Sequence, residues 1–148
     1  DSVRDSVNAR LNRLAPGERD FLETVSVIPA SFDPALVNAL FGHRGEALAT
    51  ACAGQELLVE DGGGRLRFRH ELARLATMAR LPAMRLQATH ARVLAALSGR
   101  AGCPLDLLVH HASGALVRGH GHPPQRHVRR PARRLLRGAE CRSPPPRT

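Results

Sequence analysis

The stretch LLVEDGGGRLRFRHELARLA, residues 57–76, decides the fold because its pattern changes along its length. Residues 57–60 are mostly apolar, and residues 65–69 alternate arginine with leucine or phenylalanine, as a half-buried strand does. Between them, an aspartate and three glycines form a flexible turn at residues 61–64. Two short strand patterns joined by such a turn predict a β-hairpin over residues 57–69.

A histidine and a carboxylate stand where this hairpin ends and a helix begins. His70 and Glu71 follow the second strand, and the apolar residues after them are spaced as on one side of a helix. These apolar residues are Leu72, Leu75, Ala76 and Ala79. The spacing predicts a helix over residues 71–80, with His70 in the junction before it.

Helical patterns also precede the hairpin. Asp33 and Pro34 are a typical helix start, because an aspartate caps a helix and a proline fits its first turn. Helices followed by a two-stranded hairpin are the element order of a winged helix. The predicted helices before the hairpin cover residues 2–14, 16–28, 34–41 and 45–54.

We therefore expect a mainly α fold in three parts. Residues 1–81 form a winged-helix domain, and residues 82–112 form the first helices of an attached helical, repeat-like region. Residues 113–148 form an Arg- and Pro-rich tail without a sustained apolar period. Such a tail is expected to be disordered, because it buries too little apolar surface to offset the entropy cost of ordering.

The positive charge of the chain is concentrated in this tail. Residues 1–111 hold 13 arginines and 12 acids, whereas residues 112–148 hold nine arginines and one acid, Glu140. An argument for nucleic-acid binding from the net charge of +9 therefore concerns the tail alone. Three explanations of the tail are open: a nucleic-acid-binding arm, an inert extension, or an out-of-frame translation of a GC-rich gene. We favour the out-of-frame translation as a hypothesis.

The composition argues against several kinds of chemistry. All 22 basic residues are arginine, so the chain has no G-x-x-x-x-G-K-[ST] phosphate loop, and we expect neither enzyme activity nor a cofactor in it. Cys52, Cys103 and Cys141 form no C-x-x-C pair, which favours reduced thiols. No apolar run spans a membrane and no signal peptide is visible, so we expect a cytoplasmic location without membrane contact.

For the histidines outside the tail, the sequence favours packing over catalysis. His90 lies on the apolar face of its helix, and His110 and His111 lie in an apolar segment. The Pro- and Arg-rich tail has nothing to hold a coordination geometry, so we expect no metal site there. The metal-binding residue types of the tail are His120, His122, His127 and Cys141.

Within residues 1–112, three stretches carry a family resemblance: SVRDSVNARLNRLAPGERDFLETVSVIPASFD, LLVEDGGGRLRFRHELARLA and LPAMRLQATHARVLAAL. They resemble the region after the ATPase core in large LuxR-type transcriptional regulators of actinobacteria, which belong to the STAND class of nucleotide-switched ATPases. The resemblance implies a fragment whose winged helix couples an absent ATPase domain, which binds ADP or ATP, to the helical repeats. DNA binding would then belong to a C-terminal helix-turn-helix outside this sequence.

The R-H-E-L stretch, residues 69–72, resembles the M-H-D-L signature that ends the winged helix of related nucleotide switches. By that match, His70 falls on the histidine that reaches the β-phosphate of ADP in that class. Glu71 falls on the acid and Leu72 on the core leucine, while Arg69 departs from the methionine. The resemblance therefore implies a nucleotide-sensing role for His70, supported by Glu71 and Arg69.

The residue types at this junction agree with such a role. An imidazole N–H donates to phosphate oxygens, and the free N–H groups at a helix start favour an anion. The simpler alternative is that His70 only ends the strand and Glu71 only favours the start of the helix.

Two functions of other classes remain open. A winged helix often binds DNA, and arginines on the hairpin can contact phosphates. However, the helix in the recognition position, residues 45–54, is expected to expose no Arg, Asn or Gln, the usual readers of base edges. The other possibility is a protein-interaction module in which helices within residues 71–98 dock a partner. The outward residues expected on the recognition-position helix are Glu46, Ala49, Thr50 and Ala53.

Overall fold

The predicted β-hairpin is present in the computed structural model, which describes residues 2–116. Strand β1 (Leu58–Glu60) pairs antiparallel with β2 (Leu66–Phe68), so that Leu58 lies opposite Phe68. The connecting turn is closed by the Asp61 carboxylate, which accepts hydrogen bonds from the backbone N–H groups of residues 63 and 65. Gly64 has a φ of +74°, a conformation that side-chain-bearing residues rarely adopt.

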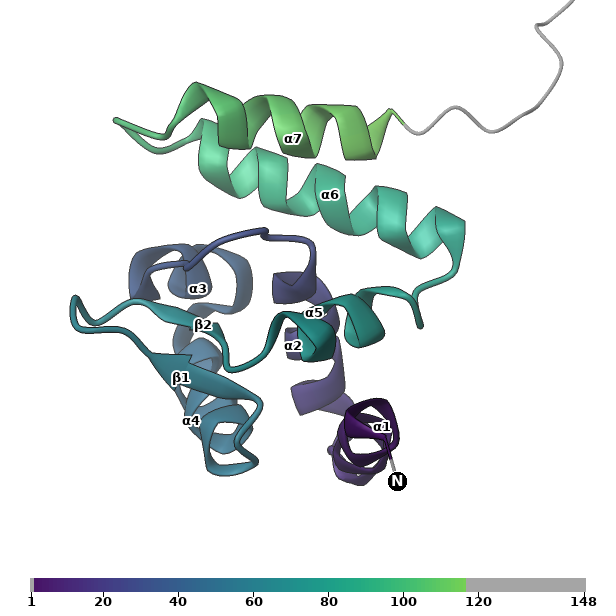
Figure 1. Ribbon diagram of the computed structural model, residues 1–148. Helices are drawn as coiled ribbons and strands as arrows, with labels where there is room; N and C mark the ends of the chain where they lie inside the picture. The colour runs from purple at the N-terminus through teal and green to yellow at the C-terminus, as the bar shows by residue number, and fades with distance from the viewer. Residues whose placement is uncertain (1, 117–148) are drawn as a thin grey trace, which may run out of the picture. The chain divides into compact units, whose positions relative to one another are not determined.

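The rest of the described chain is helical, which confirms the expected mainly α fold with one hairpin (Figure 1). Helices begin where the sequence places capping residues and prolines. Asp33 accepts a 2.7 Å hydrogen bond from the N–H of Leu36, and Ser2 forms a capping box with Asp5. The helices are α1 (Val3–Arg13), α2 (Pro16–Ser26), α3 (Pro34–Phe41), α4 (Gly45–Gly54), α5 (Glu71–Met78), α6 (Ala83–Ser98) and α7 (Leu105–Ala115), with a short 3₁₀ turn, η1 (Gly42–Arg44), between α3 and α4.

The core is centred on α2, whose expected apolar stripe is fully buried. Phe21, Leu22 and Val25 have no exposed surface, and Ile28 just after the helix is 1% exposed. Phe32, in the segment that leads to α3, forms an isolated bridge with Leu66 of β2. The hairpin is thereby joined to the segment between α2 and α3 as well as to itself.

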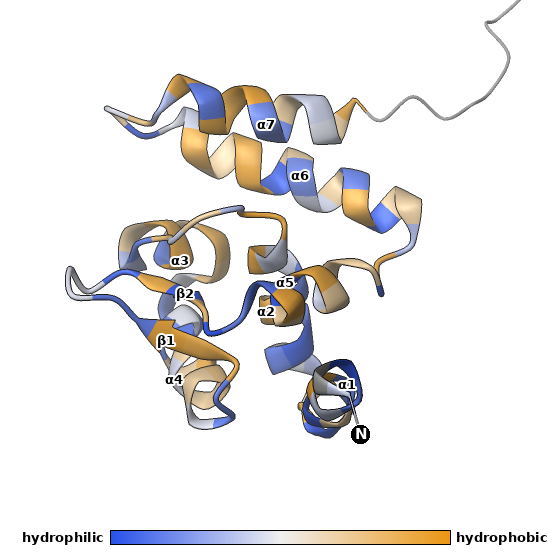
Figure 2. Ribbon diagram, viewed as in Figure 1, coloured by the Kyte–Doolittle hydropathy of each residue, from blue (hydrophilic) through white to orange (hydrophobic). Residues whose placement is uncertain are grey.

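Helix α5 differs from the expectation in which face it buries. Leu72 is 59% exposed and Leu75 is 41% exposed, so the prediction of a core position for Leu72 is wrong. The buried residues of α5 are the small Ala73 and Thr77, and the Thr77 hydroxyl donates to the carbonyl of Ala73. Small side chains let α5 approach α1 and α2 closely, so the face with Ala73 and Thr77 turns inward and the leucines remain outside. In Figure 2, α5 is largely coloured as hydrophobic.

Helices α6 and α7 pack side by side as a pair (Figure 1). Helix α7 continues to Ala115, three residues beyond residue 112, where the helical region was expected to end. A Cβ added at Gly114 would lie 2.4 Å from the Cγ atom of His90, so a glycine there allows the His90 ring to rest on the α7 backbone. The expectation for the rest of the tail, residues 117–148, lies outside the described residues.

Polar contacts fasten α6 to the helices before the hairpin. Arg100 pairs with Asp33 through two hydrogen bonds of 2.9 and 2.7 Å, and Arg92 donates to the carbonyl oxygen of Leu40 at 2.7 Å. Residues 2–116 belong to one compact unit, and no helix in that range is long and apolar enough to span a bilayer. The boundary at residue 81 between a winged helix and a repeat-like region stays a prediction.

Candidate functional site

The predicted nucleotide-sensing residues lie at the junction between β2 and α5, where the backbone is fixed on both sides. The N–H of Arg69 donates to the carbonyl of Leu57 at 3.0 Å, which extends the strand pairing by one residue. His70 has extended backbone angles (φ −132°, ψ 134°) and is the N-cap of α5. Its carbonyl oxygen accepts from the N–H of Ala73 at 3.0 Å, so His70 already belongs to the first turn.

The His70 ring is exposed and forms no hydrogen bond with another described residue. It does not cap α5, so both ring nitrogens are open to solvent or to a ligand. The N–H groups of Glu71 and Leu72, the first two of α5, have no partner among the described residues and follow His70 directly in the chain. The junction therefore offers an imidazole donor beside backbone donors, which suits an anionic oxygen.

Glu71 holds Arg74 rather than His70. The Nε and Nη2 atoms of Arg74 donate to the Glu71 carboxylate at 2.6–3.1 Å, and these bonds lower the pKa of Glu71 below its usual value. Arg74 is half-buried, and its Nη1 donates to the carbonyl of Ser26 at 2.7 Å. The pair therefore fastens the first turn of α5 to the end of α2, which fixes the helix that begins at His70.

Arg69 is directed to a different partner. Its Nη1 lies 4.0 Å from Oε1 of Glu56, which also pairs with Arg10 at 3.1 Å. Glu56 has a φ of +57°, so this acid is held in a left-handed conformation between α4 and β1. The three predicted residues are thus neighbours in sequence, but within residues 2–116 no hydrogen bond joins His70 to Arg69 or Glu71.

An apolar groove on α5 lies beside this junction, and the sequence did not predict it. Leu72, Leu75, Ala76 and Ala79 line it together with Arg4 of α1, and it encloses about 270 Å³. These are the residues whose spacing predicted the helix. The helix is present, but its two leucines lie on a surface that the described residues leave largely uncovered.

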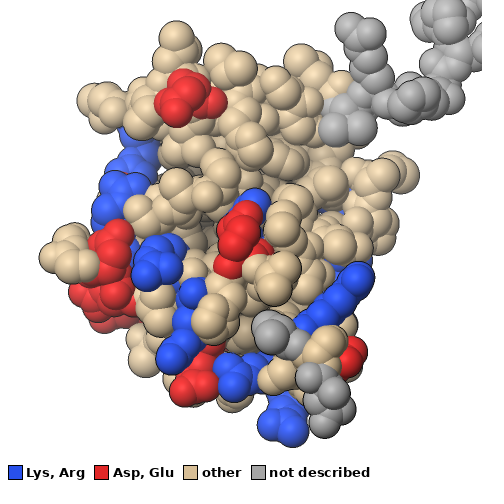
Figure 3. All heavy atoms as spheres, in the orientation of Figure 1, with Lys and Arg blue, Asp and Glu red and all other residues tan. Residues whose placement is uncertain are grey.

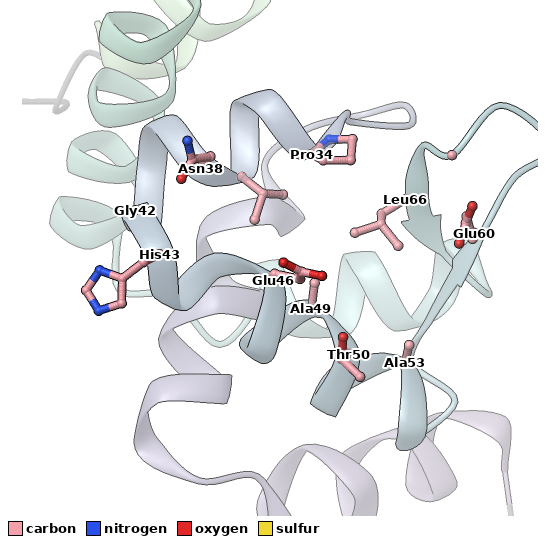
Figure 4. A pocket seen from close by; sticks show the side chains of 12 residues that line it. Pro34, Asn38, Gly42, His43, Glu46, Ala49, Thr50, Ala53, Glu60 and Leu66 are labelled. Carbon is pink, nitrogen blue, oxygen red and sulfur yellow. The ribbon is translucent and has the colours of Figure 1, made fainter.

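A larger cleft of about 570 Å³ lies between α3, α4 and the hairpin (Figure 4). Of the expected outward residues of α4, Glu46 and Thr50 are exposed, but Ala49 is 6% exposed, so its predicted outward position is wrong. The lining contains two acids, Glu46 and Glu60, and no arginine. The lining residues are Pro34, Val37, Asn38, Gly42, His43, Glu46, Ala49, Thr50, Ala53, Glu60, Gly64 and Leu66.

Two of the three hairpin arginines, Arg65 and Arg69, have partners in other segments, whereas Arg67 is exposed and contacts only the carbonyl of the adjacent Phe68, at 3.4 Å. Arg65 donates from Nε to the hydroxyl of Ser31 at 2.9 Å and from Nη2 to its carbonyl at 2.7 Å, while Arg69 faces Glu56. Basic and acidic side chains are intermixed on the face shown in Figure 3. A DNA-binding surface needs a continuous basic patch. The cleft beside α4, the helix in the recognition position, is instead lined by the acids Glu46 and Glu60. We call it the recognition-position cleft.

The predicted packing roles of His90 and His111 agree with their burial, at 6% and 0% exposure. His110 is exposed, and its Nε2 lies 3.1 Å from the carbonyl oxygen of Val27. Comparisons with protein-family models, curated proteins and solved structures find no match for this chain.

Proposed function

We propose that this chain is a regulatory module of a nucleotide-switched transcriptional regulator that resembles the LuxR-type STAND ATPases. In this proposal, His70 reports the nucleotide state of an ATPase domain that lies elsewhere in the longer protein. The observation that carries the proposal is the exposed His70 ring, which has no partner within residues 2–116 and projects from a firmly held strand–helix junction.

The surroundings of His70 support this role because they restrict its backbone without occupying its ring. The strand pairing at Arg69 fixes the chain before it, and the contact of Arg74 with Ser26 fixes the helix after it. Because the backbone is already fixed, binding of a phosphate oxygen costs the rotamer entropy of the His70 side chain but little backbone entropy. Glu71 acts as a positioning residue in this proposal, since it orients Arg74.

The apolar groove of α5 supplies a contact surface for the same ATPase domain. Leu72 lies two residues from His70 and is 59% exposed, and Leu75 continues the same surface one turn later. A domain that brings a phosphate to His70 would cover these side chains, and their burial would contribute about 25 cal/mol per Å² to the association. The interaction-module alternative uses the same helix but assigns it to a separate partner protein.

The first test is the coding DNA upstream of this sequence. The proposal expects a G-x-x-x-x-G-K-[ST] loop there, because this chain contains no lysine. An upstream sequence without such a loop would contradict the proposal. For this chain alone, we expect no ATP hydrolysis above the blank, and a clear rate would also contradict it.

The second test measures ADP affinity in the longer protein. His70→Ala removes a hydrogen bond to a charged group, worth about 1.5–3 kcal/mol, so ADP affinity falls roughly 10- to 100-fold. His43→Ala is the matched control, because His43 is also exposed but lies in the 3₁₀ turn beside the other cleft. Equal ADP affinity in the two variants would favour a separate-partner role for α5.

A further inference from the structure

Three histidines converge between α6 and α7, far from the junction at His70 in sequence. His90 comes from α6, and His110 and His111 come from α7. Each offers one ring nitrogen, and these three nitrogens lie within 4.8 Å of one another. The three ring centroids are separated by 4.9 to 5.4 Å.

Hydrogen bonding within the protein does not satisfy this cluster. The Nδ1 atoms of His90 and His111 face each other at 3.1 Å, so only one of them carries the proton between them. The Nε2 atom of His111 is buried and has no hydrogen-bond partner among the described residues. A buried nitrogen without a partner costs about 1–3 kcal/mol, so the protein's own hydrogen bonds leave this cluster incompletely paired.

The distances approach those of a metal site. Zinc–nitrogen bonds of about 2.0–2.1 Å in a tetrahedron place two ligand nitrogens about 3.3–3.4 Å apart. The facing nitrogens of His90 and His111 are already at 3.1 Å. The span of 4.8 Å among the three nitrogens must shorten by about 1 Å, and this movement falls to the ring of His110, which is exposed.

The partner of His110 is the kind that orients a metal ligand. If its Nε2–H donates to the carbonyl of Val27, its Nδ1 lone pair is left free for an ion. Burial lowers the pKa of His111 to about 4 and also lowers the pKa of His90. Both rings are therefore neutral near pH 7, the form that binds metal ions.

We propose that His90, His110 and His111 bind one divalent transition-metal ion of the zinc class, with water in the fourth position, and that this ion links α7 to α6. Imidazole ligands suit zinc, cobalt, nickel and copper, and they disfavour calcium and magnesium. The exposed side of His110 gives the ion its path in from solvent. The site is independent of the role proposed for His70.

The test is a Co²⁺ titration of the tag-free full chain, followed by visible absorption of the tetrahedral ion and by displacement with Zn²⁺. We expect one ion per chain and a raised melting temperature with Zn²⁺. His110→Ala leaves the buried pair intact, and it is expected to weaken Zn²⁺ binding at least 10-fold and to abolish the thermal shift. His111→Gln should have the same effect on binding.

The tail needs a control because it carries metal-binding residue types of its own. A variant with His120→Ala, His122→Ala, His127→Ala and Cys141→Ser should keep both the stoichiometry and the thermal shift. Absence of Co²⁺ binding by the full chain would overturn the proposal. Binding that survives His110→Ala but is lost in the tail variant would overturn it as well.

Discussion

At the scale of single residues, arginines join elements that are distant in sequence. Arg74 connects α5 to the carbonyl of Ser26, and Arg100 connects the end of α6 to the cap of α3. Arg92 donates to the carbonyl of Leu40 and stacks over the ring of Phe41, 4.7 Å from its centroid. The planar guanidinium suits each of these contacts, because it donates several hydrogen bonds in one plane and stacks on rings.

The Asp33–Arg100 pair should make stability fall in acid. Hydrogen bonds from Arg100, and then from the N–H of Leu36, hold the pKa of Asp33 below its usual value against the opposing effect of desolvation. The resulting stability is fully present above the unfolded pKa of about 3.9, and it is lost as the pH falls through the folded value.

Asp33→Asn tests this, because asparagine keeps the helix cap and removes the charge. We expect a loss of about 1 kcal/mol in the free energy of unfolding at pH 7, and a flatter decline below pH of about 4. Urea denaturation at several pH values measures both. An unchanged decline would show that other carboxylates control acid stability.

Cys52 should be inert in the folded protein. It is completely buried, and burial raises the pKa of its thiol to about 12, so almost no thiolate forms at neutral pH. We expect iodoacetamide to label Cys52 only after denaturation, whereas the half-buried Cys103 reacts in the native state. Peptide mass spectrometry measures both sites, and comparable native rates would contradict this burial.

At the scale of elements, the sequence located helices better than it oriented them. Caps and prolines marked the start of α3, and the glycine turn marked the hairpin, because these signals act within a few residues. The orientation of α5 depended on its neighbours. The close packing of α5 on α1 and α2 leaves room only for the small side chains of Ala73 and Thr77 on the buried side. The local sequence pattern does not predict this orientation, because it depends on the tertiary contacts.

Substitutions in α5 should separate its two faces. Ala73→Leu inserts a large side chain at a position that is 2% exposed, so we expect a loss of about 1–3 kcal/mol in unfolding free energy. Leu72→Ser changes an exposed side chain and should cost about 0.5 kcal/mol or less. Urea denaturation compares the two variants, and the reverse order would mean that Leu72 is the core residue after all.

Gly114 should be required for the pairing of α6 and α7. Gly114→Ala places a Cβ against the His90 ring at 2.4 Å, so the helices must move apart, at a cost of about 1–3 kcal/mol. Gly54→Ala is the control, because no atom lies within 4 Å of its added Cβ. Thermal denaturation measures both, and equal melting temperatures would show that the His90 ring moves aside freely.

At the scale of the whole molecule, composition predicted where charge is concentrated but not which surfaces face each other. The cluster of His90, His110 and His111 required α6 and α7 to be placed side by side, and the segments between these residues do not specify that register. The junction at His70 was visible from the sequence because strand, histidine and helix follow one another directly. The partners of Glu71 and Arg69 were not visible, because Ser26 and Glu56 are distant in the chain.

Nucleic-acid binding by this protein should depend on its C-terminal arginines. Residues 1–116 carry 13 arginines and 12 acids, and the recognition-position cleft is lined by Glu46 and Glu60. We expect any gel shift of duplex DNA by the full chain to weaken steeply with salt, and to disappear when residues 117–148 are removed. A shift that persists in the shortened, still helical chain would support the DNA-binding alternative.

The bridge between Phe32 and Leu66 also affects how this molecule meets copies of itself. Short strands with unpaired backbone groups invite intermolecular pairing and aggregation. Leu66 of β2 lies opposite Glu60 of β1, and on its other side its backbone N–H and carbonyl both bond to Phe32, through two N–H···O contacts of 2.8 Å. The backbone groups of Leu66 are therefore not available to a strand from another molecule, which protects the hairpin from edge-to-edge polymerisation at this residue.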